Sequence, residues 1–175
     1  MPADEIKITI ADTSHAEALT ALSITTFCDT FAVSNTPEDM DKYVAKELNV
    51  RKLKGELEDE HNLFYLAWVN GELAGYAKMR LHKEPEELAG NNPIEIERLY
   101  VLQKYLSQKV GAALMSQCIN HAKANSHDIL WLGVWEHNDP AIAFYKKWGF
   151  ELFGSHPFIL GNDHQTDVLM KKVLG

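Results

Sequence analysis

Apolar and polar residues alternate in several short stretches of the chain, and longer stretches between them place apolar residues at helical spacing. Alternation is typical of half-buried strands, and spacings of three and four residues are typical of helices. Alternation predicts a strand over residues 6–10, and further strands are predicted over residues 64–69, 72–81, 94–101, 129–135, 150–158 and 165–173. The helical segments predict helices over residues 16–31, 37–48, 50–58, 106–124 and 140–148. This order of elements indicates one mixed α/β domain with a mostly antiparallel sheet.

Capping and turn residues mark the ends of some of these elements. Thr36 can cap the helix that Pro37 begins, and Asp39 is placed to complete a capping box. Asn70 and Gly71 form a two-residue turn of the kind that joins adjacent strands in a type I′ hairpin. These signals are local, so they fix element ends more firmly than periodicity does.

The composition narrows the class of protein. The chain has 175 residues, of which 46% are hydrophobic and 24% charged, and this fits a globular domain with a real core. No segment reaches the roughly 20 apolar residues of a membrane span, and the acidic start does not resemble a signal peptide. Cys28 and Cys118 lie far apart and form no C-x-x-C pair, which favours a reduced, cytoplasmic setting. The histidines and cysteines lack zinc-binding spacing, so no metal site is expected.

The net charge of −8 is unevenly distributed. Residues 27–41 contain four acidic and no basic side chains, and residues 84–97 contain five acidic and no basic ones. Residues 101–127, in contrast, carry three lysines and no acid. An acidic chain is poorly suited to nucleic acid, so we expect no such partner. The pattern fits either solvated surfaces or a protein that binds a cation at one end of a site and a polyanion at the other.

The segment after the predicted strand 94–101 has the composition of a phosphate-binding turn. A short loop leads into a helix whose first turn contains Gln108, Gly111 and Ala113. Unpaired N–H groups and the helix dipole attract an anion at such a turn, and small side chains let it approach the main chain. Lys109 adds a mobile cation. A glycine and two alanines can equally serve helix packing, so this segment alone leaves both interpretations open.

Two segments together resemble the acetyl-CoA signature of the GCN5-related N-acetyltransferase (GNAT) superfamily. The pattern (Arg/Gln)-x-x-Gly-x-(Gly/Ala) is matched from Gln108 to Ala113, directly after the strand that ends at Val101. The second half of the signature, Asn-x-x-Ala-x-x-(Phe/Tyr)-Tyr-x-Lys-x-Gly-Phe, is matched by Asn138, Ala141, Phe144, Tyr145, Lys147, Gly149 and Phe150. The resemblance implies the α/β GNAT (acyl-CoA N-acyltransferase) fold, a mixed, mostly antiparallel sheet that is splayed at the cofactor site, with helices on both faces.

The resemblance also implies a domain organisation and an activity. It implies one N-acetyltransferase domain over residues 1–175, with an acetyl-CoA-binding core at about 92–173 and a helical substrate-side region at about 12–60. Segments 26–31, 35–40 and 131–138 resemble the PaiA-type subgroup, which acetylates polyamines such as spermidine and spermine. We therefore expect transfer from acetyl-CoA to a primary amine of a cationic small molecule, by direct attack in a ternary complex. A homodimer is compatible with this interpretation.

The family's fold places the pantetheine arm of the cofactor between two splayed strands. At the matching positions, the resemblance implies a cofactor-binding set of Leu99, Tyr100, Val101, Gln108, Lys109, Val110, Gly111, Ala112, Ala113, Asn138, Phe144 and Lys147. Backbone groups of Leu99 and Val101 would pair with the pantetheine, and an N–H group near Val101 would polarise the thioester carbonyl. Asn138 is also a natural helix N-cap, and the two roles are compatible.

Tyr145 and Glu97 are the candidate catalytic residues. A phenol is protonated at neutral pH and can protonate the departing thiolate, although Tyr145 also fits a core position. The amine arrives as an ammonium group, and the resemblance implies a carboxylate such as Glu97 near it; Glu97 is interpreted as a base or water relay, a substrate anchor or a bystander. Glu95 lies two residues away on the same strand face, where repulsion would raise one of the two pKa values, and Arg98 is expected on the opposite face.

Asp29, Glu38 and Glu95 are the candidate substrate-binding residues. Each exposed contact with a distal ammonium group would contribute about 1 kcal/mol or less, and a solvated surface is the competing interpretation.

Two other functions stay open at this point. A GNAT enzyme for another small amine, an amino acid or a peptide N-terminus would need a basic anchor, and Arg80 or Arg98 could provide it. A CoA-binding regulatory module without chemistry would keep the phosphate turn, but nothing would then hold Tyr145 and Asn138 to their residue types.

Overall fold

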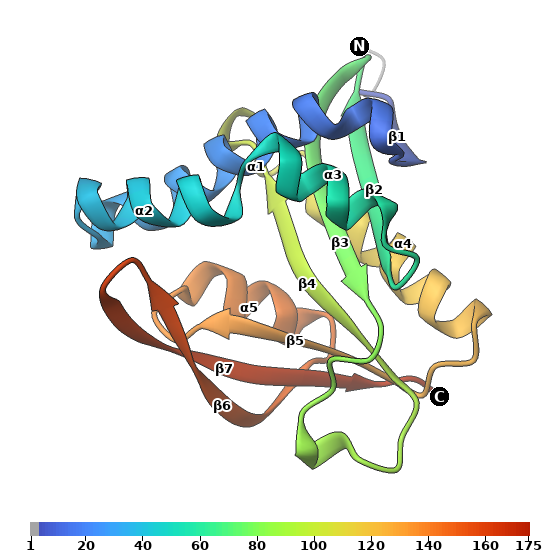
Figure 1. The fold of residues 1–175 in the computed structure, drawn as a ribbon. Coiled ribbons are helices and arrows are strands. Elements are labelled where there is room, and N and C mark those ends of the chain that lie inside the picture. Colours follow the sequence, from blue (N-terminus) through green and yellow to red (C-terminus); the bar gives the residue numbers. More distant parts are fainter. Residues whose placement is uncertain (1–3) are drawn as a thin grey trace.

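The computed structural model describes residues 4–175, and these form a seven-stranded mixed sheet with helices on both faces (Figure 1). The strands are β1 (Ile6–Ile10), β2 (Asn62–Val69), β3 (Glu72–Arg80), β4 (Pro93–Val101), β5 (Ile129–Trp135), β6 (Glu151–Leu160) and β7 (Asp163–Val173). Their order is β1-β2-β3-β4-β5-β7-β6, and all neighbours are antiparallel except β4 and β5. The predicted mixed, mostly antiparallel sheet is confirmed.

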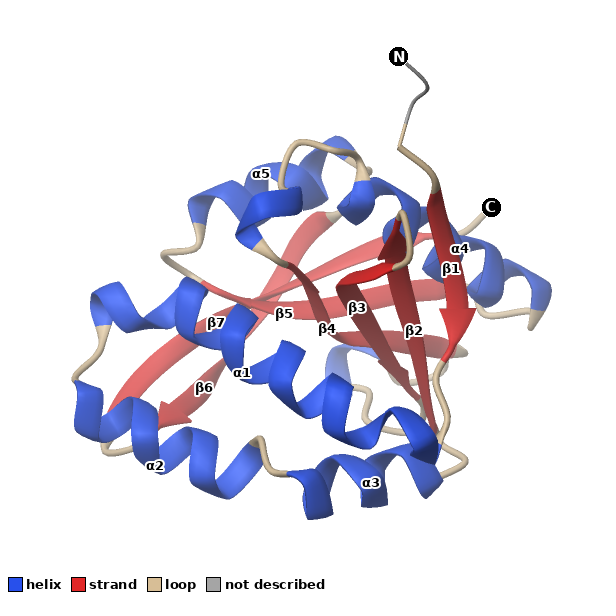
Figure 2. Cartoon of the chain, turned by 90° about the horizontal axis from the view of Figure 1, so that it is seen from above, coloured by secondary structure: helices blue, strands red, loops and turns tan. Residues whose placement is uncertain are grey.

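Two groups of helices cover the sheet within the described residues (Figure 2). The helices are α1 (Ala16–Phe31), α2 (Pro37–Glu47), α3 (Val50–Glu58), α4 (Val110–Ala124) and α5 (Asp139–Lys147). The first three pack over a core that includes Phe64 and Leu66, whereas α4 and α5 pack over a core that includes Tyr65 and Ala67. Successive residues of β2 therefore enter opposite cores, as strand geometry requires. None of these helices is long and apolar enough to cross a membrane.

Local signals fix several of the element ends. The side chain of Thr36 accepts a hydrogen bond from the N–H of Asp39 at 3.1 Å and so caps α2. Asn70 and Gly71 have φ values of +49° and +86°, as a type I′ turn between β2 and β3 requires. The carboxylate of Asp39 accepts a hydrogen bond from the N–H of Asn162 at 2.9 Å. It thereby ties the β6–β7 turn to the start of α2.

The helix predicted over 106–124 begins later, at Val110. Residues 103–105 form a short 3₁₀ helix, and a turn follows in which Ser107 and Lys109 have φ values of +70° and +67°. Residues other than glycine rarely adopt this left-handed region, and a right-handed helix cannot continue through it. Apolar periodicity gives no sign of left-handed residues, so the predicted helix start is too early.

Strand β4 contains a bulge at Glu97. Lys78 of β3 lies opposite Arg98, whereas the next residue, Met79, lies opposite Ile96, so Glu97 is the extra residue. The prediction that Arg98 points to the face opposite Glu97 is therefore wrong. The two side chains approach each other to 3.8 Å, because a bulge interrupts the alternation on which that prediction rested.

Candidate active site

Strands β4 and β5 diverge shortly after they begin to pair. Their paired residues end with Glu95 opposite Trp131, and within residues 4–175 the two strands share no further pairs. The N–H of Leu102 donates to the carbonyl of Ala74 at 2.8 Å, which fixes the alternation between β3 and β4. Leu99 and Val101, three and one residues earlier, therefore direct their backbone groups away from β3 and toward the space between β4 and β5.

The start of α4 lies at the open end of this divergence. Ala113 is the first residue whose N–H is bonded within the helix, to the carbonyl of Lys109 at 3.0 Å. The N–H groups of Val110, Gly111 and Ala112 precede it and have no intrahelical acceptor. No described side chain caps this end, and Lys109 is exposed without an ion pair in the described chain. Main-chain donors and one mobile cation are thus available to an anion.

Two other residues of this turn are engaged within the protein. The side-chain amide of Gln108 donates to the carbonyl of Lys104 at 3.0 Å and braces the turn. Lys104 itself pairs with Glu72 at 2.8 Å. Lys109, rather than Lys104, is therefore the cation that this turn can offer to a ligand.

Gly111 brings the two motif segments together. A Cβ atom built on Gly111 would lie 3.6 Å from the ring of Phe144 in α5 and 3.9 Å from Val101 Cγ2. These are ordinary contacts, so packing does not require a glycine here. The structure thus gives no support to the packing interpretation of Gly111, and the absence of a side chain leaves its main chain open to close approach.

The remaining motif residues lie on α5. Tyr145 is 8% exposed, and burial raises the pKa of its hydroxyl, so the phenol stays protonated at neutral pH. The ring centroid of Tyr145 lies 5.5 Å from that of Phe144, so the aromatic ring of Tyr145 packs in the core. Asn138 caps α5 by accepting from the N–H of Ala141 at 3.4 Å, which confirms its N-cap role. Lys147 is exposed in the last turn.

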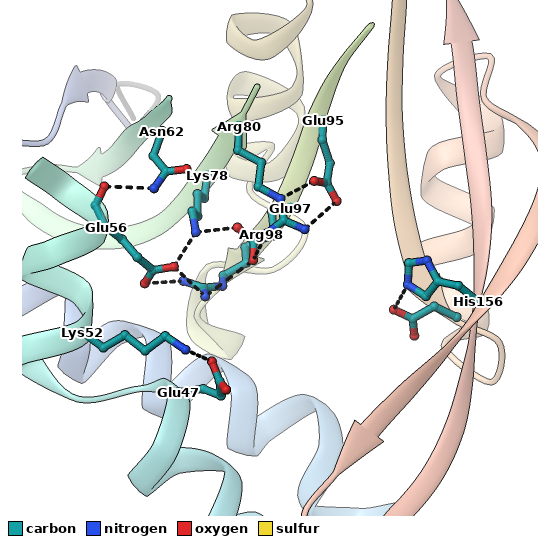
Figure 3. A network of polar contacts seen from close by, with 11 residues as sticks. Glu47, Lys52, Glu56, Asn62, Lys78, Arg80, Glu95, Glu97, Arg98 and His156 are labelled. Atoms are coloured by element: carbon teal, nitrogen blue, oxygen red, sulfur yellow. Dashed lines mark hydrogen bonds and ion pairs between the residues drawn. The ribbon is translucent and has the colours of Figure 1, made fainter. Parts of the chain in front are cut away.

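A cluster of six charged residues covers the β4 side of the divergence, on the face of α1 to α3 (Figure 3). We call it the charge cluster; its members are Glu56, Lys78, Arg80, Glu95, Glu97 and Arg98. Lys78 bridges Glu56 and Glu97, and Arg80 bridges Glu95 and Glu97, the latter at 3.1 Å. The three acids and three bases balance, which buried charges require.

The two β4 carboxylates respond to the charge cluster in opposite directions. Burial alone would raise the pKa of Glu97, but Arg98, Lys78 and Arg80 outweigh it and hold that pKa below its usual value. Burial raises the pKa of Glu95, against the effect of its bond to Arg80, and the charge of Glu97 adds to the rise. The predicted repulsion is therefore present, but burial is the larger cause.

The three candidate substrate-binding residues are not brought together. Asp29 is exposed on α1 and has no ion pair in the described residues. Glu38 is exposed on α2 and pairs with Lys42 at 3.1 Å. Glu95 is 5% exposed and bonded to Arg80, so it is not a free surface anchor.

Sequence reasoning missed four residues near the divergence. Lys78 and Glu56 complete the charge cluster, and His156 Nε2 lies 3.6 Å from Asp167 Oδ2 beside β5. A lysine between the apolar residues of β3 was a visible signal for Lys78. No sequence signal links the other three to the site, because the sheet register and the packing of α3 bring them there.

Comparisons with known proteins agree with this geometry. The sequence matches the acetyltransferase (GNAT) family over residues 24–150, a range that includes both motif segments. An uncharacterized N-acetyltransferase in the pepI 3′ region of Lactobacillus delbrueckii subsp. lactis is 39% identical over 169 residues, which are 97% of this chain and 98% of the relative. The spermine/spermidine N(1)-acetyltransferase of Bacillus subtilis is 26% identical over 92 residues, 52% of this chain and 60% of that protein.

The fold is shared with solved structures. The PaiA N-acetyltransferase of Thermoplasma acidophilum, in complex with coenzyme A, superposes with a TM-score of 0.80 at 21% identity. The match covers 97% of this chain and 99% of that one. The splayed mixed sheet expected from the motifs is confirmed by this likeness.

Proposed function

The chain belongs to the GNAT family of acetyltransferases, and we propose that it moves an acetyl group from acetyl-CoA to a primary amine of a polyamine such as spermidine or spermine. The transfer is a direct attack in a ternary complex. The observation that carries the proposal is the divergence of β4 and β5, with the backbone of Leu99 and Val101 facing it and the unpaired N–H groups of α4 at its open end.

The residues present fit coenzyme A. N–H groups of Val110, Gly111 and Ala112 bind the diphosphate, Lys109 adds a positive charge, and the missing side chain of Gly111 leaves room for close approach. Leu99 and Val101 pair with the amide groups of the pantetheine arm, in the way a further strand would. Bound acetyl-CoA supplies an activated thioester.

The chain's own groups then stabilise charge and move protons. An N–H group of β4 near Val101 donates to the thioester oxygen as negative charge develops there. Tyr145, kept neutral by burial, donates its hydroxyl proton to the leaving sulfur. Phe144 packs against the cofactor wall beside Gly111, and Asn138 and Lys147 hold the cofactor from α5.

The geometry favours an electrostatic role for Glu97 over that of a strong base. Three cations contact its carboxylate, and a lowered pKa means a lower affinity for the proton of an ammonium group. Glu97 can position a water molecule that takes the ammonium proton only if that water also contacts a group with a higher proton affinity than Glu97.

Three observations support a polyamine as the acceptor. The chain carries a net charge of −8, and its acidic residues are concentrated in residues 27–41 and 84–97. It also resembles, over about half its length, a protein named as a spermine/spermidine acetyltransferase. An amino-acid acceptor has less support, because Arg80 and Arg98 are each already paired with carboxylates.

A thiol-release assay with spermidine, spermine, free amino acids and short peptides tests the proposal. We expect the highest kcat/KM for the polyamines. A higher kcat/KM for another amine would overturn the substrate, and acetyl-CoA binding without turnover of any amine would favour a regulatory module. Absence of acetyl-CoA binding in calorimetry would overturn the whole proposal.

A further inference from the structure

A histidine and an aspartate face each other on the two C-terminal strands. His156 of β6 and Asp167 of β7 are register partners, and His156 Nε2 lies 3.6 Å from Asp167 Oδ2. The aspartate side chain is 17% exposed and the histidine side chain 44% exposed. The carboxylate is thus largely enclosed, while the imidazole keeps one side open to solvent or to a ligand.

This pair lies over the β5 side of the divergence. A Cβ atom on Gly133 would lie 3.5 Å from both Asp167 Oδ2 and His156 Cε1, so the pair sits directly on the backbone of β5. Gly133 is two residues beyond Trp131, where pairing with β4 ends. Glu97 is two residues beyond Glu95 on the other strand. His156 and Glu97 therefore occupy corresponding positions on the two sides of the divergence, and Figure 3 shows His156 apart from the charge cluster.

The two sides differ in their capacity to accept a proton. Three cations surround Glu97, whereas the imidazole of His156 faces one carboxylate. From the elements packed against it, β7 presents Asp167 and β5 presents Gly133, and no other described residue forms an ion pair with His156. Imidazole is the side chain whose charge changes near neutral pH, and a carboxylate on one ring nitrogen leaves the other free to accept.

We propose that His156 is a catalytic base of the acetyl transfer and that Asp167 is its positioning residue. The inference rests on the proposed function only in requiring an amine acceptor, whichever amine that is. His156 takes one proton from the ammonium group, and the neutral nitrogen then bonds to the acetyl carbon. As the carbon–sulfur bond breaks, Tyr145 gives its hydroxyl proton to the sulfur, and the second proton of the nitrogen replaces it on Tyr145. The single proton left over passes from His156 to solvent.

The competing explanation is an ordinary cross-strand pair that only stabilises the hairpin. His156→Gln separates the two explanations in steady-state kinetics with saturating acetyl-CoA. We expect kcat to fall about 100-fold or more, with KM for acetyl-CoA unchanged. His61→Gln is the matched control, because His61 pairs with Asp59 at 3.1 Å in a turn between α3 and β2, away from the divergence.

The pH profile provides a readout that a structural role would not change. The wild-type rate should reach a plateau well below the pKa of the amine, because His156 accepts the ammonium proton. Without this base, the rate should keep rising about tenfold per pH unit toward the pKa of the amine, about 10.4 for a lysine-like group. Asp167→Asn should lower kcat and leave KM for acetyl-CoA unchanged, because the imidazole loses the carboxylate that positions it.

An unchanged kcat and pH profile in His156→Gln would overturn the inference, as would equal losses in His61→Gln. If His156→Gln does not fold by circular dichroism, Asp167→Asn decides, and an unchanged kcat in that variant contradicts the proposal. Both variants are assayed with whichever amine the wild-type protein turns over. Failure of every amine would overturn the proposed function, whereas turnover that is indifferent to His156 would overturn this inference alone.

Discussion

The two ends of the β4–β5 divergence take their polar groups from different parts of the chain. At the open end, the backbone of Leu99, Val101 and the first turn of α4 provides the polar groups, and the side chains are small or absent. Nearer the closed end, the six buried or partly buried side chains of the charge cluster provide them. The first arrangement can bind a ligand shared by a whole family, because main-chain groups do not depend on side-chain identity. The charge cluster can be specific to one protein, because each of its side chains needs its particular partners of opposite charge.

The largest effect should follow from breaking the charge cluster. Lys78 is 3% exposed and bridges Glu56 and Glu97, so Lys78→Met leaves two buried carboxylates short of a cation. We expect the free energy of unfolding to fall by about 3 kcal/mol, the lower part of the range for broken buried pairs, because Arg98 and Arg80 still contact them. Urea denaturation measures this loss.

Acid pH and a surface pair provide the controls for Lys78→Met. The pKa of Glu97 is lowered in the folded state, so its contribution to stability is present above its ordinary pKa and is lost as pH falls through the folded-state pKa. The gap between wild type and variant should therefore narrow on acidification. Lys42→Met, which breaks the exposed pair with Glu38, should change stability by no more than about 0.5 kcal/mol. Equal losses in the two variants would contradict the distinction between buried and surface charge.

The second effect concerns chemistry at the open end rather than stability. Tyr145→Phe removes the proposed proton donor and should lower kcat by about 100-fold, while the ring keeps its packing against Phe144. Tyr65→Phe is the control, because its hydroxyl bonds His121 at 3.1 Å on the far part of α4. Full kcat in Tyr145→Phe, with the chemical step rate-limiting, would remove the residue from the mechanism.

Some features of the fold could be predicted from the sequence and others could not. The element order and the turn at Asn70 were predictable, because periodicity and local turn residues encode them. The start of α4 at Val110 was not, since left-handed residues such as Ser107 and Lys109 leave no mark on apolar spacing. The fold thus follows from patterns along the chain, except where one residue reverses its direction.

The acceptor side was predicted less well for a related reason. Strict alternation placed Arg98 on the wrong face, because a bulge arises from the pairing of β3 with β4 and not from β4 alone. Glu56, His156 and Asp167 reach the divergence from three other elements. No spacing in the sequence connects residues that only the sheet register brings together.

The third effect should separate binding from stability at one glycine. Gly111→Ala adds a methyl group that makes only ordinary contacts, so the folded protein should be as stable as before or slightly more stable. The same methyl group would lie where the diphosphate approaches the main chain, and we expect KM for acetyl-CoA to rise about tenfold, or about 1.4 kcal/mol. Gly55→Ala in α3 is the control, since its methyl group would meet nothing within 4 Å. An unchanged KM for acetyl-CoA in Gly111→Ala would contradict diphosphate binding at the start of α4.

The smallest effect should come from the exposed acids. Asp29→Asn removes one charge from α1 without breaking an ion pair in the described residues, so the fold should be unaffected. If Asp29 contacts a distal ammonium group, KM for spermidine should rise by at most about fivefold, because an exposed contact contributes about 1 kcal/mol or less. The rise should shrink as salt screens the charge, and it should be absent for a monoamine. Glu38→Gln is the matched comparison, because Lys42 already neutralises Glu38 and no comparable rise is expected. Equal changes in the two variants, or a salt-independent change, would mean that net charge rather than contact attracts the polyamine.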